Sequence, residues 1–322
     1  MKLLALTDGQ ITGLVPPTVL ITAVEMATRT AETNLGSVPH RAHMHWQDNT
    51  LLSMPAVAER LLGIKLVSVI PSNATRGLPV VQGLMVLQDA LTGVPLALMN
   101  ASALTAQRTG AVGALGIKYT TPLEVSSVGI VGCGVQAAWQ AVFACAVRPI
   151  TDIFCLARSE ARRGRFTATV QRYAPAARIT FCADADALLA GTDVIIAATT
   201  SADPVLPNES KRLLGKHFLS IGSFKPTMQE LPDEVYRLAG ELIIDSDAAR
   251  HEAGDVVNVL ARKILRPEEV FTLGALITGE RSIDVSRTTA FKSVGMALFD
   301  LYVANALYQE AQRQHIGQEI EL

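Results

Sequence analysis

The chain has 322 residues, of which 49% are hydrophobic and 18% are charged, and its formal net charge is -2. This balance excludes intrinsic disorder, and the lack of a long Lys/Arg run excludes the basic surface typical of nucleic-acid-binding proteins. The length favours two domains over one core. We therefore expect a globular protein whose partner is a small anionic molecule.

The N-terminal sequence and the cysteines indicate the cellular compartment of the protein. The opening MKLLALTDGQ has a short apolar run that an Asp-Gly pair ends, so it does not resemble a secretory signal. Four cysteines lie in apolar surroundings without metal-type spacing, which is typical of reduced thiols. These are Cys133, Cys145, Cys155 and Cys182. We expect a cytoplasmic protein without disulfides.

The first third of the chain mixes short apolar runs with turn signals. KLVSVI (65–70) and LALMN (96–100) are strand-like and are separated by SNATRG, VQGLMVLQD and the turn LTGVP, which indicates a small mixed α/β unit. ASALTAQRTGAVGALGIK (101–118) has helical spacing and predicts a helix, with Ser102 near its start as a cap.

After Thr121-Pro122 buried strands alternate with helices. The strand candidates are SSVGIVG, TDIFCLA, RITFCAD, DVIIAATT, HFLSIG and ELIID. Near-continuous apolar strands of this kind favour a parallel sheet covered on both faces. From Phe291 to Gln312 the pattern predicts one long amphipathic helix that needs a partner.

One stretch raises a choice between a membrane and a nucleotide. VSSVGIVGCGVQAAWQAVFACAV is uncharged between Glu124 and Arg148 and is long enough to cross a bilayer, which takes about 20 apolar residues. Its glycines and glutamines, and the α/β pattern on both sides, contradict a membrane helix. We therefore expect no membrane association.

The same stretch fits a dinucleotide-binding strand, turn and helix. Gly132 permits the tight turn, and Gly134 lets a pyrophosphate approach the N–H groups of the helix that Val135 and Gln136 begin. Ala137 takes the third small position. Because the glycines follow a strand and open a helix, the motif predicts a nicotinamide dinucleotide site.

The end of the next strand bears on the choice of cofactor. NAD sites usually carry an acidic residue there, but this chain has Ala157 followed by Arg158 and Ser159, with Arg162 and Arg163 one turn later. Guanidinium and hydroxyl groups suit a 2′-phosphate. We expect NADP(H), with NAD(H) still possible; the alternative is a solvated basic helix start.

Two other polar groups are interpreted as structural. His40, His43 and His45 cluster in HRAHMH, but no Cys or carboxylate ligand pattern accompanies them, so we expect no metal site. Asp245 and Asp247 lie where a strand ends and a helix begins, where acidic caps are common.

At this point the sequence resembles the ornithine cyclodeaminase and mu-crystallin family, which includes alanine dehydrogenases and ketimine reductases. The likeness covers nearly the whole chain. It rests on GIKLVSVIPSN, LTAQRTGAVGALG, VGIVGCGVQA, DVIIAATTS, GSFKPTMQEL, EAGD and FKSVGMALFDLYVA.

The resemblance implies an α/β fold of two domains. A Rossmann-type doubly wound parallel sheet, residues 123–298, would be inserted in a second, smaller mixed α/β domain built from residues 1–122 and 299–322. The second domain would bind substrate and dimerise, so a homodimer is expected.

The resemblance also implies a basic site for a substrate carboxylate, made by Arg41, Lys65 and Arg108. Arginine binds carboxylate through two parallel hydrogen bonds, and a lysine between two arginines should have a lowered pKa and donate a proton. Lys65 lies in an apolar run, where a lysine is costly unless paired or used. From the residues alone, Arg41 could be an ordinary surface residue and Arg108 could snorkel.

Further cofactor contacts follow from the resemblance. Thr109 matches a family position near the cofactor phosphate. The other expected contacts are Thr199, Thr200, Ser201, Gly222 and Ser223.

One departure from the family separates the possible activities. The cyclodeaminases read Gly-x-Asp-x-Pro, whereas this chain reads Gly222-Ser223-Phe224-Lys225-Pro226, which puts Phe224 at the Asp position. A phenyl ring cannot act as acid or base, and the neighbouring Ser223 hydroxyl is too weakly basic to replace a carboxylate. The sequence therefore argues against ammonia-releasing cyclodeamination.

The resulting hypothesis is an NADPH-dependent reductase of a small, cyclic imino acid. Ornithine cyclodeaminase activity and amino-acid oxidation of the alanine dehydrogenase type are alternatives within the family. An alternative of another class is a mu-crystallin-type protein that binds NADPH and a small ligand without turnover.

Overall fold

The computed structural model describes residues 2–321, which divide into two compact units. Unit 1 comprises Met1–Arg108 and Met296–Leu322, and unit 2 comprises Thr109–Gly295. The division falls inside helix α3 (Ala101–Thr120). The sequence placed the domain boundaries after residues 122 and 298, and these boundaries stay a prediction.

Unit 1 is built on a sheet of eight strands, in the order β16-β1-β7-β6-β5-β4-β2 with β3 paired to β4. Strands β1 and β7 are parallel and the other pairs are antiparallel. The expected strands at KLVSVI and LALMN are confirmed as β5 and β7. The bounds are β1 (Lys2–Leu6), β2 (Gly36–Ser37), β3 (Ala42–Trp46), β4 (Asn49–Ala58), β5 (Leu61–Val69), β6 (Val81–Asp89), β7 (Pro95–Asn100) and β16 (Gln318–Glu321).

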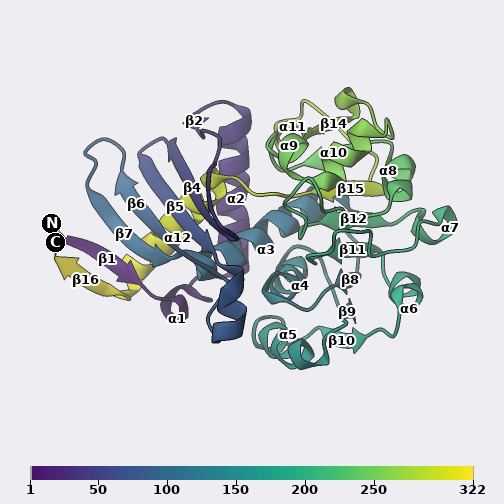
Figure 1. Cartoon of the computed structure of the whole chain (residues 1–322), viewed down its shortest axis with the longest axis horizontal. Coiled ribbons are helices and arrows are strands. Elements are labelled where there is room, and N and C mark those ends of the chain that lie inside the picture. The colour runs from purple at the N-terminus through teal and green to yellow at the C-terminus, as the bar shows by residue number, and fades with distance from the viewer. Residues whose placement is uncertain (1, 322) are drawn as a thin grey trace. The chain divides into compact units, whose positions relative to one another are not determined.

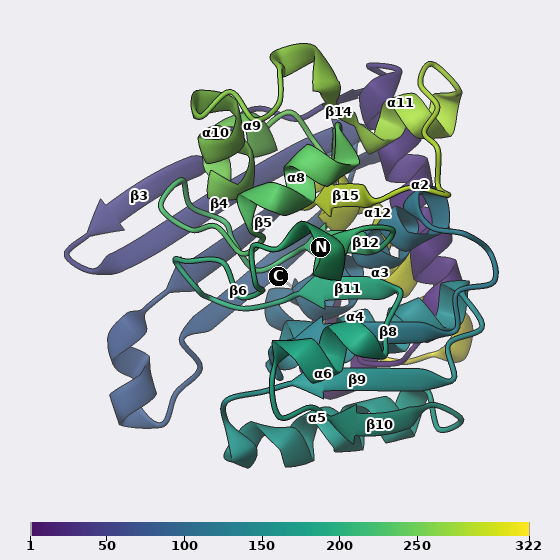
Figure 2. The same cartoon turned by 90° about the vertical axis from the view of Figure 1, so that its right-hand side faces the viewer.

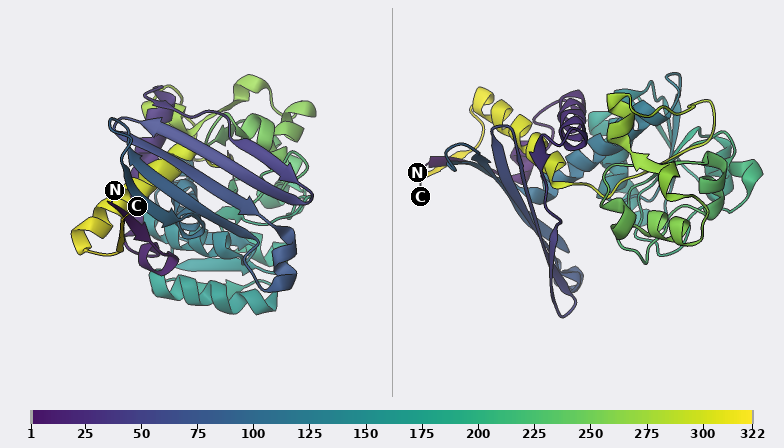
Figure 3. Two further views of the ribbon diagram at one scale, coloured as in Figure 1. Left: turned by 60° about the vertical axis from the view of Figure 1, so that its left-hand side comes forward. Right: turned by 90° about the horizontal axis from the view of Figure 1, so that it is seen from above.

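The two faces of this sheet differ. Helix α12 (Ala297–Gln314) packs on strands β4, β5 and β6 and on helix α2 (Pro17–Glu32), as Figure 1 and the view from above in Figure 3 show. Along β5, Gly63, Lys65 and Val67 are buried, whereas the alternate residues, including Leu66, are only partly covered. The shorter elements are α1 (Asp8–Ile11) and the 3₁₀ turn η1 (Pro71–Arg76).

Unit 2 is built on an eight-stranded parallel sheet in the order β10-β9-β8-β11-β12-β15-β13-β14, which confirms the expected doubly wound fold (Figure 2). The strand order reverses between β8 and β11. The strands are β8 (Ser127–Val131), β9 (Asp152–Leu156), β10 (Arg178–Phe181), β11 (Val194–Ala197), β12 (His217–Ser220), β13 (Leu242–Ile244), β14 (Val270–Thr272) and β15 (Thr289–Lys292). The helices are α4 (Val135–Val147), α5 (Glu160–Tyr173), α6 (Ala185–Ala190), α7 (Ser210–Leu213), α8 (Asp233–Ala239), α9 (Ala249–Glu252), α10 (Gly254–Ala261), α11 (Leu273–Thr278) and the 3₁₀ turn η2 (Pro267–Glu269).

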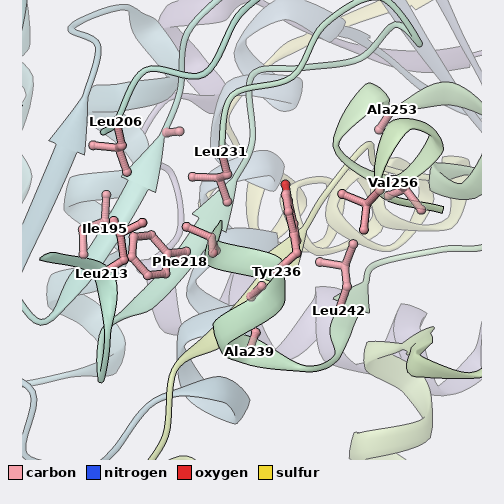
Figure 4. Packing of buried hydrophobic residues seen from close by; sticks show 14 of the residues in the cluster. Ile195, Leu206, Leu213, Phe218, Leu231, Tyr236, Ala239, Leu242, Ala253 and Val256 are labelled. Atoms are coloured by element: carbon pink, nitrogen blue, oxygen red, sulfur yellow. The ribbon is translucent and has the colours of Figure 1, made fainter. Parts of the chain in front are cut away.

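The core of unit 2 fills the space between this sheet and its helices. Figure 4 shows Ile195 and Phe218, from neighbouring strands, packed near Leu213, with Leu231 and Tyr236 farther along the cluster. All five side chains are fully buried. A core this dense fixes the strand ends, and therefore the loops that follow them.

Helix α3 confirms the helix expected from Ala101 onward, but a different residue caps it. The Asn100 side chain accepts a hydrogen bond from Ala103 N at 3.0 Å, whereas the Ser102 hydroxyl donates to Val81 O at 3.3 Å. Asparagine is at least as good an N-cap as serine. The expected role of Ser102 as the cap was therefore wrong.

The sequence predicted one long C-terminal helix that begins at Phe291, and this predicted start was wrong. The stretch that contains Phe291 forms β15, which lies between β12 and β13, and α12 begins only at Ala297. All four residues of β15 are buried, so the strand shows no alternation of polar and apolar residues. Gly295, with φ 79°, lies in the loop between the two elements.

The uncharged stretch that also fitted a membrane helix forms β8 and then α4. Within residues 2–321, every helix is too short or too polar to span a bilayer.

Candidate functional site

The glycine-rich loop after β8 has the geometry that a dinucleotide phosphate requires. Gly132 has φ 110°, and a Cβ there would lie 2.6 Å from Ala198 O, so only glycine fits. Gly134 is the N-cap of α4, and among the described residues no atom lies within 4 Å of the position its Cβ would take. Val135 begins the helix with 68% of its surface exposed. The N-terminus of α4 is therefore open, and its first N–H groups can bind an anion.

The end of β9 carries the residues expected to choose between cofactors. Arg158 is exposed, and Ser159 is the half-buried N-cap of α5. Arg163 is committed to the fold, because it donates to Ala157 O at 3.1 Å and its guanidinium lies 5.0 Å from the centre of the Phe181 ring. Arg158 is thus better placed than Arg163 to bind a 2′-phosphate.

Two further loops follow β11 and β12. Thr200 is exposed, Thr199 and Ser201 are half-buried, and the Ser201 hydroxyl donates to Asp203 O at 2.7 Å. A Cβ on Gly222 would lie 1.9 Å from Thr199 O, so the two loops touch through their main chains.

Three expected cofactor contacts have side chains that the fold hides wholly or in part. Ser223 is fully buried, and its hydroxyl donates to Asp255. Thr109 is 7% exposed, with its carbonyl accepting a hydrogen bond from Gln140 Nε2 at 2.8 Å. Gln136 is half-buried. A cofactor contact at Ser223 would have to come from its main-chain carbonyl, because its N–H donates to Glu230 at 3.0 Å.

A cluster of charged side chains lies inside unit 1. Lys65, on β5, places its Nζ 2.8 Å from both carboxylate oxygens of Asp300, on α12. Arg108, near the middle of α3, places its Nε 3.2 Å from Asp300 Oδ1. All three residues are at least 93% buried, and the Lys65 ammonium also reaches the Thr105 hydroxyl at 3.4 Å. We call Arg41, Lys65, Arg108 and Asp300 the lysine cluster.

The pKa of Lys65 is lowered to about 8, first by burial and then by the charges of Arg108 and Arg41, while Asp300 raises it. Arg41 therefore acts on the same ammonium, although it is only half-buried. Lys65 and Arg108 both pair with the single carboxylate of Asp300, so these three buried side chains carry one positive charge in excess. Such an excess in a buried place favours binding of an anion.

Phe224, at the position of the family carboxylate, is 53% exposed, and the Lys225 ammonium lies 5.6 Å from its ring centre. Glu230, the nearest carboxylate in the sequence, and Asp255 are fully buried and bound to other groups. Neither of these two carboxylates can take the place of the missing Asp.

Asp245, interpreted as an acidic cap, has a structural role at a loop, and the N-cap of the following helix α9 is Ala248. Asp245 accepts hydrogen bonds from the Ser293 hydroxyl at 2.7 Å and from Gly295 N at 2.6 Å, so it holds the loop after β15. His43 and His45 lie on the exposed strand β3, and within residues 2–321 no group of three or more His, Cys, Asp or Glu side chains could hold a metal ion.

The buried partners of two groups were not expected from the sequence. The first is Asp300, in the lysine cluster. The second set, which we call the carboxylate network, lies in unit 2 and consists of Ser220, Ser223, Glu230, Tyr236, Asp255 and Lys292. A signal was present, because Asp300 in ALFDLYVA and Lys292 in AFKSVG are single charges inside apolar runs, as Lys65 is.

Comparisons with known proteins show the family to which this chain belongs. The profile of the ornithine cyclodeaminase/mu-crystallin family matches residues 9–315. A Delta(1)-pyrroline-2-carboxylate reductase from Bacillus cereus is 34% identical over 85% of this chain and 86% of its own length. This chain belongs to the ornithine cyclodeaminase/mu-crystallin family.

Solved structures agree with this assignment over the full length. The Delta(1)-pyrroline-2-carboxylate reductase of Thermococcus litoralis, in complex with NADH and L-proline, has a TM-score of 0.91 and 28% identity, covering 99% of this chain and 100% of that one. An archaeal alanine dehydrogenase dimer with bound NAD has a TM-score of 0.90 and 28% identity, and both chains are fully covered.

Proposed function

We propose that this protein is an NADPH-dependent reductase that adds hydride to the C=N bond of a small cyclic imino acid. The relatives indicate an NAD(P)-dependent oxidoreductase acting on carbon–nitrogen bonds. The observation that carries the choice of substrate is the lysine cluster, because a buried excess of positive charge beside a proton-donating lysine suits an imino acid with a carboxylate.

Reduction of a C=N bond needs a hydride for the carbon and a proton for the nitrogen. A bound reduced nicotinamide supplies the hydride. Lys65 supplies or relays the proton, because its pKa of about 8 leaves it mostly protonated at neutral pH and makes it a stronger acid than an ordinary lysine. A C–H and an N–H bond form, and Lys65 is left neutral until solvent protonates it again.

Binding of the substrate carboxylate is assigned to Arg41 and Arg108. Arginine stays charged under all relevant conditions and presents parallel N–H groups to a carboxylate. Of the two, Arg108 is held by Asp300, so its direction is fixed before substrate arrives. Pre-oriented groups lower the entropic cost of binding.

NADPH is proposed as the preferred cofactor, with NADH possible. The support is local: Ala157 provides no carboxylate for a ribose 2′-hydroxyl, while Arg158 is exposed beside the N-cap Ser159. The cofactor contacts are assigned to the loop Gly132–Gly134, to the start of α4, to Thr199–Ser201, and to the main-chain carbonyls of Gly222 and Ser223.

The natural test is to mix the purified protein with NADPH and pyrroline-2-carboxylate and follow the loss of reduced-cofactor absorbance. Rapid loss supports the proposal. No loss with any cyclic imino acid, or with an oxo acid plus an amine, despite tight NADPH binding, would favour a non-catalytic binding protein.

Deamination and amino-acid oxidation are separated by their products. L-ornithine with oxidised cofactor should give no appreciable proline and ammonia, because Phe224 cannot perform the acid–base steps of ammonia release. Robust formation of both would overturn this part of the proposal. Amino-acid oxidation is the reverse of the proposed hydride step and is assayed with L-proline and L-alanine.

A homodimer is proposed through the sheet face of unit 1 that is opposite α12. Val57, Leu66 and Leu84, from β4, β5 and β6, are 36%, 36% and 48% exposed, and they occupy strands that pair with one another. An apolar sheet face of this kind is typical of an interface between proteins. A similar archaeal alanine dehydrogenase is a dimer.

A cytoplasmic location is also proposed. All four cysteines are free, and three are buried. The pKa of Cys155 is raised to about 12, first by burial and then by the neighbouring Cys133 and Cys182. Thiols of this kind are unreactive and are typical of proteins in a reducing compartment.

A further inference from the structure

A single buried carboxylate in unit 2 joins two loops. Glu230 Oε1 accepts hydrogen bonds from the main-chain N–H and the hydroxyl of Thr199, at 2.6 and 2.8 Å. Its Oε2 accepts from Gly222 N at 2.6 Å, from Ser223 N at 3.0 Å and from the Ser220 hydroxyl at 3.0 Å. Donors from the ends of β11 and β12 therefore meet one fully buried side chain, and the single proton of the Ser220 hydroxyl lies within reach of both Glu230 and Asp255 Oδ2, the latter at 3.1 Å.

The carboxylate matters because of where these two loops lie in the sheet. In open parallel sheets a dinucleotide binds at the carboxyl ends of the strands, where the strand order reverses, which here is between β8 and β11. The loop after β8 takes the pyrophosphate and the end of β9 takes the adenosine ribose. The loops after β11 and β12 are left for the nicotinamide half.

The two loops have little freedom to take another arrangement. Any side chain at Gly222 would collide with Thr199 O, and a Cβ there would also lie 2.7 Å from Glu230 Oε1. The N–H groups of these two loops point into the protein interior, where each of them needs a hydrogen-bond acceptor. Without one, the loops would not stay this close together. Glu230 is that acceptor on both sides.

The rest of the carboxylate network compensates the buried charge. Asp255 accepts from the Tyr236 hydroxyl at 2.5 Å and from Leu231 N at 3.1 Å, and it also binds Ser223. Lys292, fully buried, donates to the Ser220 hydroxyl at 3.1 Å, and its electrostatic interactions with Asp255 and Glu230 oppose the lowering of its pKa by burial.

We propose that Glu230 is a positioning residue for the nicotinamide half of the cofactor, acting by fixing the loops after β11 and β12. This inference rests on the proposed use of a nicotinamide cofactor. It does not depend on the identity of the imino acid, because the carboxylate is buried and contacts only the protein.

The test uses E230Q, which keeps the size of the side chain but loses its charge and turns an NH₂ group toward N–H donors. The affinities of NADPH and of 2′-phospho-ADP-ribose, which lacks only the nicotinamide, are measured by calorimetry for wild type and variant. We expect NADPH to bind about tenfold more weakly and the fragment to change by less than about twofold.

The matched control is Y236F, which removes a buried hydrogen bond to Asp255 from the same network and leaves every bond between Glu230 and the loops in place. It should lower the melting temperature without changing the ratio of the two affinities. An unchanged ratio in E230Q, whether both ligands weaken equally or neither does, would overturn the inference.

Two further outcomes are decisive. If E230Q does not fold, S220A is used instead, since it deletes one donor to Glu230 and keeps the charges; a loss of about threefold for NADPH alone supports the inference, and no selective loss contradicts it. If the wild type binds neither NADPH nor NADH, the proposed function itself fails.

Discussion

Unit 1 and unit 2 both bury charged side chains, but they compensate the charge in opposite ways. In the carboxylate network of unit 2, main-chain N–H groups, hydroxyls and Lys292 surround Glu230 and Asp255. In the lysine cluster of unit 1, Lys65 and Arg108 share the one carboxylate of Asp300. In the first set, hydrogen-bond donors of the protein satisfy the carboxylate oxygens, whereas in the second set the cations outnumber the carboxylates.

This difference separates scaffold from site. A buried charge costs several kcal/mol unless hydrogen bonds or a partner compensate it, so a surplus of positive charge persists where an anion completes the set. Unit 1 should therefore control the affinity and protonation of the substrate, and unit 2 should control the affinity for the cofactor. Variants that alter one property and leave the other unchanged test this division.

The largest effect is expected from K65M, which keeps a long side chain but removes the proton donor. We expect kcat/KM for the imino acid to fall about a thousandfold, within the usual range for loss of a general acid. The affinity for NADPH should change by less than about twofold, because Lys65 belongs to unit 1. Steady-state kinetics and calorimetry provide the two readouts.

A control for K65M is K216M, in unit 2, where the ammonium donates to Thr192 O at 2.7 Å. It should leave kcat/KM within about twofold of wild type. A K65M enzyme that keeps its activity but loses cofactor affinity would break the proposed division between the units.

Replacing Asp300 by Asn should move the pH dependence of the reaction. In the proposed mechanism protonated Lys65 is the acid, so kcat/KM should be level below its pKa and fall as the pH rises through about 8. Asp300 raises that pKa, whereas burial and the two arginines lower it. Without Asp300 the fall should begin at lower pH, with a loss of about thirtyfold at neutral pH.

The pH–rate profile distinguishes this role from a purely structural one. D300E keeps the negative charge and should restore the pH of the fall, even if its longer side chain lowers the maximal rate. A D300N profile that falls at the same pH as wild type would show that Asp300 does not act through the protonation of Lys65.

The sequence predicts a feature well when that feature depends on residues that are close together in the chain. The glycine loop, the helix after it and the burial of Lys65 depend on neighbours in the chain, so a motif or an apolar run indicates them. The partners of buried charges are not local. Asp300 is 235 residues from Lys65, and Glu230 is 31 residues from Thr199.

The helix wrongly expected from Phe291 has the same origin. A strand buried on both faces has no alternation, and a following apolar helix makes the two elements look continuous. Only the pairing of β15 with β12 and β13 decides the structure there. Tertiary pairing of this kind is what periodicity cannot supply.

A smaller effect is expected from R158A. Loss of one exposed guanidinium should weaken NADPH about tenfold and leave NADH within about twofold, because only NADPH carries the 2′-phosphate. The control is R165A, an exposed arginine farther along α5. Equal changes for NADPH and NADH would contradict the assignment, whereas a change in imino-acid affinity at saturating NADPH would contradict the division between the units.

The smallest effect on the chemistry is expected from L66E. Leu66 lies on β5 next to Lys65 in sequence, but its side chain is on the opposite face of the sheet and is 36% exposed. A glutamate there should convert a dimer to a monomer in light scattering, because a charge is costly in an apolar interface. The rate per active site should stay within about twofold, since Lys65 keeps its partners.

The control is L91E, in the exposed turn after β6, which should stay dimeric. A wild type that is already monomeric would refute the dimer, and a large loss of activity in L66E would show that the two faces of this strand are coupled.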